Sequence, residues 1–492
     1  MTLLLTALGA VLRFSALSRQ SFWYDEAVSV ALARHSVWEL VTGRAKDLGN
    51  PPLYPVLLHL WTRVFGMGDG SVRALSALFG TATIPVVVAL ARRAFPARVA
   101  FLGATLLAVA PFHLQMSQEA RAYTLLSFLG ACAGLALVRA TETPRRVGPW
   151  IGLALATAGL GLTHYFGFFL AFAQALSLTV VHRRDRAILG RAALAYLGAA
   201  LLFSFWIPAL RAQMGVSGNL ARSAESWYLH LFATPLVFSL GTTLVWKDAA
   251  SWPRLLLGVL GAVAFTASCW LGLYRTVMTP AARRNPYTLL LVSWLVVPVL
   301  IPAAISVLAS PLYNTRYVIV ASLPFFLFTA AGLYELGANA RTALAGLMVI
   351  AMGASTMSYL RRPVKHQWRE AARFVEAVRL PSDLLLFDAD YNETAYAHYA
   401  GPGGDRIRLL APPEGAGASQ FYGAIKVGDP PADLTGQVAA HDRVWLILAD
   451  AGRDNADRER ALFAPAQWQA HPETVLRGIT VQLFTKLGAP KP

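Results

Sequence analysis

Long apolar stretches separated by short polar turns fill the first 360 residues of the chain. A helix that spans a bilayer needs about 17–25 mostly apolar residues, and eleven stretches reach or approach that length. The pattern predicts an α-helical polytopic membrane protein with about eleven transmembrane helices within residues 1–360. The expected spans are Leu3–Leu17, Val72–Leu90, Val99–Met116, Tyr123–Val138, Trp150–Leu162, Phe166–Val181, Ala192–Leu210, Arg254–Tyr274, Tyr287–Leu308, Tyr317–Leu336 and Ala343–Tyr359.

The first apolar stretch is short and carries Arg13. A secretory signal is the competing interpretation of such a segment. A signal places a basic leader before its apolar run, and no such leader precedes this one. We therefore expect a retained helix.

The pattern changes after Tyr359, where short segments of helical and strand periodicity alternate with polar residues. Residues 361–492 are predicted to form a small soluble α/β domain, of a size common for domains. The elements expected are a helix over Trp368–Val378, strands over Leu384–Phe387, Val444–Leu448 and Ile479–Phe484, and loops over Gly401–Gly404 and Pro412–Gly417.

Composition supports the membrane assignment, because 56% of the 492 residues are hydrophobic and only 14% are charged. These values are too apolar for an ordinary soluble protein. The net charge of +16 does not indicate a nucleic-acid partner, since the basic residues fall in short clusters between apolar stretches. Cys132 and Cys269 both lie inside apolar stretches, so no disulfide framework is expected.

The basic clusters predict the orientation of the chain, because cytoplasmic loops of membrane proteins are enriched in Lys and Arg. With these clusters inside, the first long loop, residues 18–70, lies outside, and so does the C-terminal domain. The segment His230–Trp246 is apolar but would upset this scheme if it crossed the membrane, so we expect a re-entrant or interfacial segment there. The clusters are Arg92-Arg93 with Arg98, Arg139 with Arg145-Arg146, His182–Arg191, and Arg283-Arg284.

An acidic pair, Asp25-Glu26, follows the first apolar stretch closely. Carboxylates are costly at a bilayer boundary and usually have a chemical purpose there. The predicted topology collects further polar groups on the same outer face. They are Asp47 and Asn50 from the first loop, Gln118, Glu119 and Arg121 from the second, His164 and Tyr165 from the third, and Asn314, Arg316 and Tyr317 from the fifth. Carboxylates for acid/base work and arginines for a phosphate suit transfer from a membrane-bound sugar phosphate.

Five segments together resemble the bacterial branch of the protein mannosyltransferase-like family. They are Phe22–Ala27 (FWYDEA), Asn50–Trp61 (NPPLYPVLLHLW), Ser117–Tyr123 (SQEARAY), Thr163–Phe166 (THYF) and Thr315–Tyr317 (TRY). That branch belongs to the GT-C glycosyltransferases, with the aminoarabinose and galacturonosyl transferases that modify lipopolysaccharide. The resemblance covers roughly Met1–Tyr359, and the combination is far more specific than any single motif.

The resemblance implies a bacterial inner-membrane enzyme that moves a hexosyl or pentosyl group from a polyprenyl-phosphate donor. The acceptor would be a glycolipid such as lipopolysaccharide, or a protein, on the outer face, and the anomeric carbon would be inverted. By the same resemblance Asp25 is the general base, with Glu26 and Glu119 as further catalytic candidates. The expected ligands of the donor phosphate are Arg121, Arg316, Tyr317, His164 and Tyr165. Residues expected to shape the loop are Trp23, Tyr24, Asp47, Asn50, Pro51, Pro52 and Tyr54.

The chain departs from several relatives directly before the double proline. Those relatives carry an acidic-basic pair there, whereas this chain has Gly49 and Asn50. A metal at that point is therefore doubtful. A divalent cation, Mg²⁺ or Mn²⁺, held by Asp25 and Glu119 stays open, because two carboxylates often hold these ions but the spacing does not require one.

Structural roles compete with several of these assignments. Asp25 has the side chain of a helix cap and would suit an interfacial helix beginning near Ala27. Glu119 and Arg121 are close enough in sequence to pair with each other. Asp388-Ala389-Asp390 in the tail resembles the metal-binding DxD of soluble nucleotide-sugar transferases, but a turn-forming acidic pair is the simpler interpretation.

The alternative function from another class is a polytopic transporter or lipid flippase. A transporter would favour repeated halves, broken helices and ionisable groups near the midplane. Here the charges gather at one predicted surface and no internal repeat is visible. A membrane glycosyltransferase is the interpretation that the sequence favours.

Overall fold

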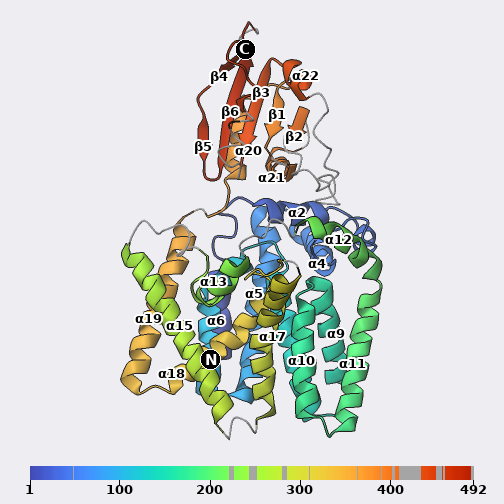
Figure 1. Cartoon of the computed structure of the whole chain (residues 1–492), viewed down its shortest axis with the longest axis vertical. Coiled ribbons are helices and arrows are strands. Elements are labelled where there is room, and N and C mark those ends of the chain that lie inside the picture. The colour runs from blue at the N-terminus through green and yellow to red at the C-terminus, as the bar shows by residue number, and fades with distance from the viewer. Residues whose placement is uncertain are drawn as a thin grey trace.

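The computed structural model consists of a body of long helices with a small α/β domain at one end (Figure 1). It describes residues 1–47, 49–220, 227–242, 252–279, 285–309, 311–362, 364–388, 390–401, 405–408, 434–449, 457 and 460–488. The predicted loop over Pro412–Gly417 and the basic pair Arg283-Arg284 lie outside these residues.

Each of the eleven predicted apolar stretches is helical. Within the described residues, six helices are long and apolar enough to cross a membrane, or seven if the bent pair α6–α7 is counted as one span, and shorter apolar helices accompany them. The helices of the body are α1 (Thr2–Phe14), α5 (Asp69–Ala94), α6 (Ala97–Val109), α7 (Pro111–Ser117), α8 (Tyr123–Glu142), α9 (Val147–Thr163), α10 (Gly167–Val181), α11 (Arg186–Ser204), α12 (Ile207–Leu220), α13 (Trp227–Leu240), α15 (Trp252–Met278), α17 (Pro286–Leu308), the 3-10 turn η2 (Ile319–Ala321), α18 (Ser322–Tyr334) and α19 (Ala338–Arg361).

One predicted span is broken where α6 meets α7, with a bend of 54° at Ala110. Pro111 has no N–H to donate to the carbonyl of Leu107, so the helix ladder loses a bond at this point. The buried guanidinium of Arg13 supplies donors instead, 3.2 Å from the Leu107 oxygen and 2.8 Å from the Ala108 oxygen. Arg13 is therefore the partner of a helix break, which explains an arginine inside the first apolar stretch.

The predicted span Ala192–Leu210 also divides, since α11 ends at Ser204 and α12 begins at Ile207. The segment predicted as re-entrant or interfacial contains α13, whose Thr234 hydroxyl lies 2.8 Å from the Tyr313 hydroxyl and whose Leu240 carbonyl accepts a hydrogen bond from Ser355. Whether α13 crosses the membrane stays open, and residues 243–246 of that segment lie outside the described part.

The basic clusters that the structure describes gather at the end of the body away from the α/β domain. Arg93 at the end of α5 pairs with Glu142 at the end of α8 at 3.1 Å, and its carbonyl accepts a hydrogen bond of 3.2 Å from Asn285 at the start of α17. The first long loop and the α/β domain lie at the opposite end (Figure 1). The described basic clusters therefore lie at the opposite end from the first long loop, as predicted. Which compartment each end faces stays a prediction.

The first long loop contains three helices, namely α2 (Tyr24–Ala33), α3 (Val37–Val41) and α4 (Leu53–Phe65). The sequence offered only a helix beginning near Ala27, and only as an alternative. Ser36 caps α3 and accepts a hydrogen bond from the Glu39 backbone at 3.3 Å. Helix α2 lies directly below the α/β domain and packs against its α21 (Figure 1).

The α/β domain contains one mixed sheet with the strand order β2-β1-β3-β6-β4, and β5 pairs with β6. The predicted helix and the three predicted strands are all present. Strand β1 is parallel to β2 and β3, whereas β6 is antiparallel to β3, β4 and β5. The elements are α20 (Trp368–Val378), β1 (Leu384–Phe387), α21 (Asp390–Ala400), β2 (Asp405–Arg408), α22 (Leu434–Ala439), β3 (Arg443–Leu448), β4 (Trp468–Ala470), β5 (Thr474–Leu476) and β6 (Ile479–Lys486).

Successive side chains of a strand point to opposite faces of the sheet, and in β1 the residues on both faces are apolar. Leu385 and Phe387 pack with α20 and α21 on one face, and Leu384 and Leu386 pack with α22 on the other. Ala27 of α2 belongs to the first of these clusters. The core of the α/β domain therefore extends onto the first loop.

Polar contacts fix the domain to the start of α5. Asp69 forms an ion pair with Arg369 of α20 and accepts a hydrogen bond of 2.9 Å from the Tyr399 hydroxyl of α21. The same hydroxyl accepts a hydrogen bond of 2.6 Å from the backbone of Phe22. The segment just before the acidic pair is therefore held by the C-terminal domain.

Candidate active site

The acidic pair lies in the first turn of α2, and its two carboxylates point to different surroundings. The helix begins at Tyr24, and the Glu26 side chain accepts a hydrogen bond of 3.4 Å from the backbone of the capping residue Trp23. The alternative in which Asp25 caps a helix starting near Ala27 is therefore wrong. Glu26 satisfies the helix start, and Asp25 is available for another role.

Glu26 is fully buried, and both of its carboxylate oxygens accept hydrogen bonds. Its two oxygens accept hydrogen bonds of 2.7 and 2.8 Å from Arg73, 2.8 Å from Lys365 and 3.0 Å from the Ala120 backbone. Burial raises the pKa of Glu26, but the charges and hydrogen bonds of Arg73 and Lys365 lower it by more, to about 2. Glu26 is thus an ionised anchor that joins the first loop, the second loop and the chain entering the α/β domain.

Arg73 of α5 reinforces this anchor. Besides Glu26, its guanidinium donates to the backbone carbonyls of Leu17, Gln20 and Ser21 at 2.7–2.9 Å. Five N–H groups in a planar fork allow one arginine to hold a carboxylate and several carbonyls together. Arg73 therefore holds the chain between α1 and α2 at several points, just before Asp25.

Asp25 differs from Glu26 because its carboxylate remains partly open, with 26% of its side chain exposed. Its nearest charged partner is Arg121, whose Nε lies 4.0 Å from Oδ2. Among the described residues the Asp25 carboxylate accepts no hydrogen bond within normal distance. A carboxylate in this state has lone pairs free for a substrate hydroxyl.

Arg121 bridges Asp25 and Asp47. Its Nη1 donates 3.0 Å to the Asp47 carboxylate and makes longer contacts of 3.4 Å with the Asp25 carbonyl and the Ser29 hydroxyl. Burial lowers the pKa of Arg121, but Asp25 and Asp47 raise it well above the ordinary value. The predicted alternative, a pair between Glu119 and Arg121, is not formed by the described side chains.

Asp47 and Asn50 close the turn that leads to the double proline. Asp47 accepts hydrogen bonds of 3.0 Å from the Gly49 backbone and 2.9 Å from the Asn50 side chain. Pro52 occupies the N-cap position of α4, and Pro51, the residue before it, is buried. The turn therefore fixes the carboxylate that orients Arg121.

Tyr54 and Tyr24 support the loop from inside. The Tyr54 hydroxyl lies 2.8 Å from the Ser76 hydroxyl, which donates 3.2 Å to the Arg121 carbonyl. Tyr24 packs against the small apolar cluster of Val28, Leu32, Leu40 and Ala45. Both tyrosines therefore make contacts within and beside the loop, and their predicted role in shaping it stays a prediction.

Arg316 lies over the face of Trp23, with 4.7 Å between its guanidinium carbon and the ring centroid. Among the described residues its side chain forms no ion pair within 4.0 Å and no hydrogen bond, whereas its backbone N–H donates to Asn314 at 3.0 Å and its carbonyl accepts from Ile319 at 3.4 Å. Burial lowers the pKa of Arg316, but Glu119 and Asp25 raise it above its ordinary value. The guanidinium is therefore charged, oriented and open to a ligand.

Glu119 is buried beside this arginine, and its Oε2 has no hydrogen-bond partner among the described residues. Burial raises the pKa of Glu119 above its ordinary value, although Arg316 and Lys365 partly oppose that rise. Two carboxylates, Asp25 and Glu119, thus interact electrostatically with Arg316 at the end of the body next to the α/β domain.

His164 and Tyr317 lie together in an aromatic group, with 4.8 Å between ring centroids. The His164 Nδ1 accepts a hydrogen bond of 3.1 Å from the Phe166 backbone. Burial, helped by the charge of Arg121, lowers the pKa of His164 to about 3. The imidazole is neutral, so any contact with a phosphate would come from its other N–H and not from charge.

Tyr165 points toward α12. Its hydroxyl donates to the Gln213 side chain and accepts a hydrogen bond of 3.0 Å from Trp206. Gln213 in turn donates to the Asp47 carbonyl. Tyr165 is therefore connected to the turn at Asp47 through the Gln213 side chain. Its predicted contact with the donor phosphate stays a prediction.

A divalent cation at this site stays a prediction. Among the described residues no group of three or more His, Cys, Asp and Glu side chains could hold a metal ion. Asp25 has Arg121 at 4.0 Å, and Glu119 is next to the charges of Arg316 and Lys365. A cation bound by Asp25 and Glu119 remains the sequence-based possibility, and no reaction step below depends on one.

The acidic tripeptide in the tail has a structural role at its first residue. The Asp388 carboxylate accepts hydrogen bonds of 2.7 Å from both Asn392 and the Ala449 backbone, and Asp388 is buried. Ala389 lies outside the described residues. These bonds favour the turn interpretation over a metal-binding DxD.

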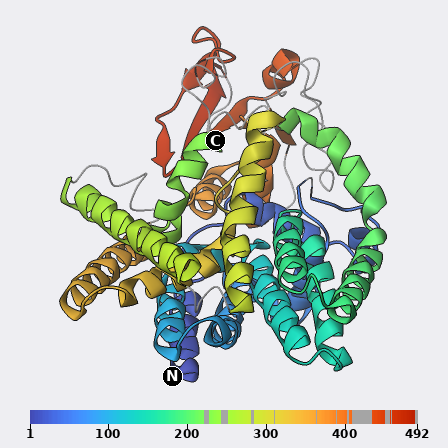
Figure 2. The ribbon, with the colours of Figure 1, turned by 60° about the horizontal axis from the view of Figure 1, so that its bottom comes forward.

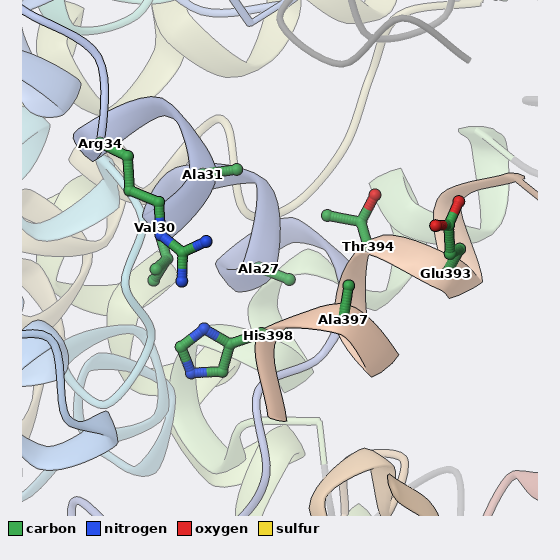
Figure 3. Close-up of a pocket in the computed structure, with 8 residues that line it drawn as sticks. All are labelled: Ala27, Val30, Ala31, Arg34, Glu393, Thr394, Ala397 and His398. Carbon is green, nitrogen blue, oxygen red and sulfur yellow. The ribbon is translucent and has the colours of Figure 1, made fainter. Parts of the chain in front are cut away.

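A pocket of about 170 Å³ lies between α2 and α21, on the side of α2 that faces the C-terminal domain. Figure 3 shows the Arg34 guanidinium and the His398 ring pointing toward each other across it, with Glu393 and Thr394 farther along α21. Asp25 is not among its lining residues. This pocket adjoins the candidate site and is distinct from it.

Sequence reasoning missed Arg73 and Lys365, the two cations that hold Glu26. An arginine inside the apolar α5 was a detectable signal, because charged groups in such segments usually face a buried partner. Lys365 gave no comparable signal, since a lysine just after a span normally marks a loop. Its role depends on how the tail folds back onto the first loop.

Residues 49–211 match the model of the dolichyl-phosphate-mannose-protein mannosyltransferase family. No curated protein sequence matches the chain. The family match covers the turn at Asn50, Arg121 and His164, but not Asp25 or Arg316.

Solved structures match over a longer range. ArnT from Cupriavidus metallidurans in the apo state is 15% identical, with a TM-score of 0.64, covering 98% of this chain and 97% of that one. The same protein bound to undecaprenyl phosphate gives 14% identity and a TM-score of 0.65 with the same coverage.

The Archaeoglobus fulgidus oligosaccharyltransferase tethered to an acceptor peptide is 14% identical, with a TM-score of 0.52, over 90% of this chain and 68% of that one. The similarity to ArnT includes the C-terminal domain as well as the helical body, because nearly the whole of both chains is covered. The chain therefore has the fold of ArnT over nearly its whole length, and its residues 49–211 are similar to the dolichyl-phosphate-mannose-protein mannosyltransferase family.

Proposed function

We propose that the protein is an inverting glycosyltransferase that moves a sugar from a polyprenyl-phosphate donor to an envelope acceptor. The observation that carries this proposal is the contrast within the acidic pair. Glu26 is saturated by Arg73 and Lys365, whereas Asp25 is rigidly supported but has an open carboxylate beside Arg121. Solved structures of the same fold include one with undecaprenyl phosphate bound.

Asp25 acts as the general base in this proposal. Its carboxylate takes the proton of the acceptor hydroxyl while the hydroxyl oxygen bonds to the anomeric carbon. The bond from that carbon to the phosphate oxygen breaks on the opposite face, and its electron pair stays with the leaving polyprenyl phosphate. A positioned base contributes about 10²–10⁴-fold to such a step.

Arg316 is the principal ligand of the donor phosphate. Its planar fork is charged and unoccupied by described partners, and the Trp23 ring fixes its orientation. Arg121 has a different part, because Asp47 already holds one of its nitrogens. It keeps Asp25 in place and adds positive potential where the phosphate gains charge.

Burial makes these charges effective, because ionic interactions strengthen when water is excluded. The neutral His164 and the phenol of Tyr317 form an aromatic wall next to Arg121 and Arg316. That wall suits the sugar ring or the first part of the lipid.

The acceptor, the membrane face and the compartment complete the proposal. The clustering of basic residues at the end opposite Asp25 supports a site on the outer face of a bacterial inner membrane, with the C-terminal domain extracytoplasmic. Lipopolysaccharide, another glycolipid or a protein would supply the hydroxyl. The domain resting on α2 is well placed to contact such an acceptor.

Mass spectrometry of envelope glycolipids and glycoproteins, from cells with and without the gene, tests this function. The proposal predicts one glycosylated species that disappears with the gene and returns with the parental protein. The Asp25→Asn protein, expressed at the parental level, should not restore it. Unchanged glycolipids and glycoproteins in the deletion strain would contradict the proposal and would favour the transporter alternative.

A further inference from the structure

A second pocket lies at the end of the body opposite the candidate active site. It has a volume of about 480 Å³ and lies between the turn from α8 to α9 and the start of α11. Helices α9 and α11 run side by side from this end toward the first loop (Figures 1 and 2). The lining residues are Thr143, Pro144, Arg145, Arg146, Asp185, Ala187, Ile188 and Arg191.

The pocket has an excess of positive charge. Arg145 and Arg146 are exposed, and among the described residues neither side chain forms an ion pair or a hydrogen bond. The lining also contains the acid Asp185, whose Oδ1 accepts hydrogen bonds of 3.0 Å from the backbones of Ala187 and Ile188. Three arginines therefore line the pocket with one carboxylate.

The turn that carries two of these arginines is held in place. The Pro144 carbonyl accepts hydrogen bonds of 2.6 Å from Arg191 and 3.0 Å from the Trp150 indole. The Arg146 backbone donates 3.0 Å to the Thr143 carbonyl. The pocket is thus preorganised, and a ligand would not have to order the turn first.

The surroundings of the pocket indicate a lipid and not a soluble anion. Helix α9 presents Val147, Ile151 and Leu155 outward, and α11 presents Leu194 and Leu197, all of them exposed in the isolated chain. These apolar strips begin at the pocket and continue along the two helices. An anionic head group bound by the arginines would place its acyl chains along them.

We propose that this pocket binds the phosphate head group of an anionic phospholipid, such as cardiolipin. Basic pockets between transmembrane helices at the cytoplasmic surface bind such head groups, and each nearby Lys or Arg contributes about 1 kcal/mol. The site is separate from Asp25 and does not depend on the proposed glycosyl transfer.

The test uses the purified full-length protein and cardiolipin, titrated in detergent and followed by native mass spectrometry and thermal unfolding. The Arg145→Gln/Arg146→Gln variant should bind cardiolipin about 30-fold more weakly, at about fivefold for each arginine. Its unfolding temperature without lipid should equal that of the parent, because neither side chain has a described partner.

The matched control is Arg183→Gln/Arg184→Gln, which removes the same charge from the same end of the body but from outside the pocket lining. It should retain nearly parental binding. Equal losses in the two variants would overturn the proposal, because they would show a general surface attraction. Competition by inorganic phosphate as effective as that by cardiolipin would overturn it too, because the ligand would then be a soluble anion.

Discussion

Replacing Glu26 by Gln tests whether this buried carboxylate is an anchor. The substitution keeps the shape but leaves Arg73 and Lys365 facing a neutral amide in a site with no exposed surface. Removing one member of a buried ion pair costs about 3–5 kcal/mol. The lowering of the Glu26 pKa from 4.5 to about 2 gives a similar figure, roughly 3 kcal/mol at about 1.4 kcal/mol per pKa unit.

The assay is chemical unfolding in mixed micelles, with trypsin cleavage of the chain between α1 and α2 as a local measure. We expect Glu26→Gln to lower the free energy of unfolding by about 3 kcal/mol and to accelerate that cleavage. Glu142→Gln is the matched control, because Glu142 pairs with Arg93 at 3.1 Å but is 35% exposed. Its loss should be at most about 1 kcal/mol.

The same prediction has a dependence on pH. Because the pKa of folded Glu26 is below its ordinary value, its contribution to stability is complete above pH 4.5 and is lost as the pH falls toward 2. Across that window the stability of the parent should fall more steeply than that of Glu26→Gln. Equal stability of the two proteins at pH 7, or parallel curves below it, would refute the role of Glu26 as an ionised anchor.

Three further predictions concern the site and its support. Arg316→Ala should raise the donor concentration needed for half-maximal transfer by about tenfold or more, since a charged hydrogen bond contributes roughly 1.5–3 kcal/mol, and Arg316→Lys should restore only part of it because lysine lacks the planar fork. Arg121→Ala should reduce the maximal rate at saturating donor as well, because it also releases Asp25; unchanged donor saturation curves for both alanine variants would count against these roles. A periplasmic reporter enzyme fused after Arg362 should be active, and activity of a cytoplasmic reporter at that position would show that the orientation is reversed.

The helical body could be predicted because its signal is local. A run of apolar residues specifies a membrane helix without reference to the rest of the chain, and each of the eleven expected stretches is helical. Two of them are broken, and the break between α6 and α7 has a tertiary partner. Pro111 marks one break in the sequence, but its stabilisation by Arg13 comes from a residue about a hundred positions away.

The residues of the candidate site could be named from the sequence, but their roles stay predictions. Family resemblance identified Asp25, Glu26, Arg121 and Arg316, and the structure brings them to the same end of the body. The resemblance did not reveal that the Glu26 carboxylate is filled with hydrogen bonds while that of Asp25 is not. That difference depends on Lys365, which follows the last predicted span. Helices α3 and α4 of the first loop were missed, and α2 was considered only as an alternative beginning near Ala27, because interfacial helices are short and interrupted by polar residues.

The most direct measurement is the rate of sugar transfer by purified Asp25→Asn protein in lipid nanodiscs, with a labelled polyprenyl-phosphate sugar and an envelope lipid extract. Asparagine keeps the size of aspartate but cannot accept the proton, so transfer should fall by about 10²-fold or more, while donor binding persists and unfolding matches the parent. Transfer at the parental rate by a correctly inserted Asp25→Asn protein would contradict the assignment of Asp25 as the base, and with it the central claim.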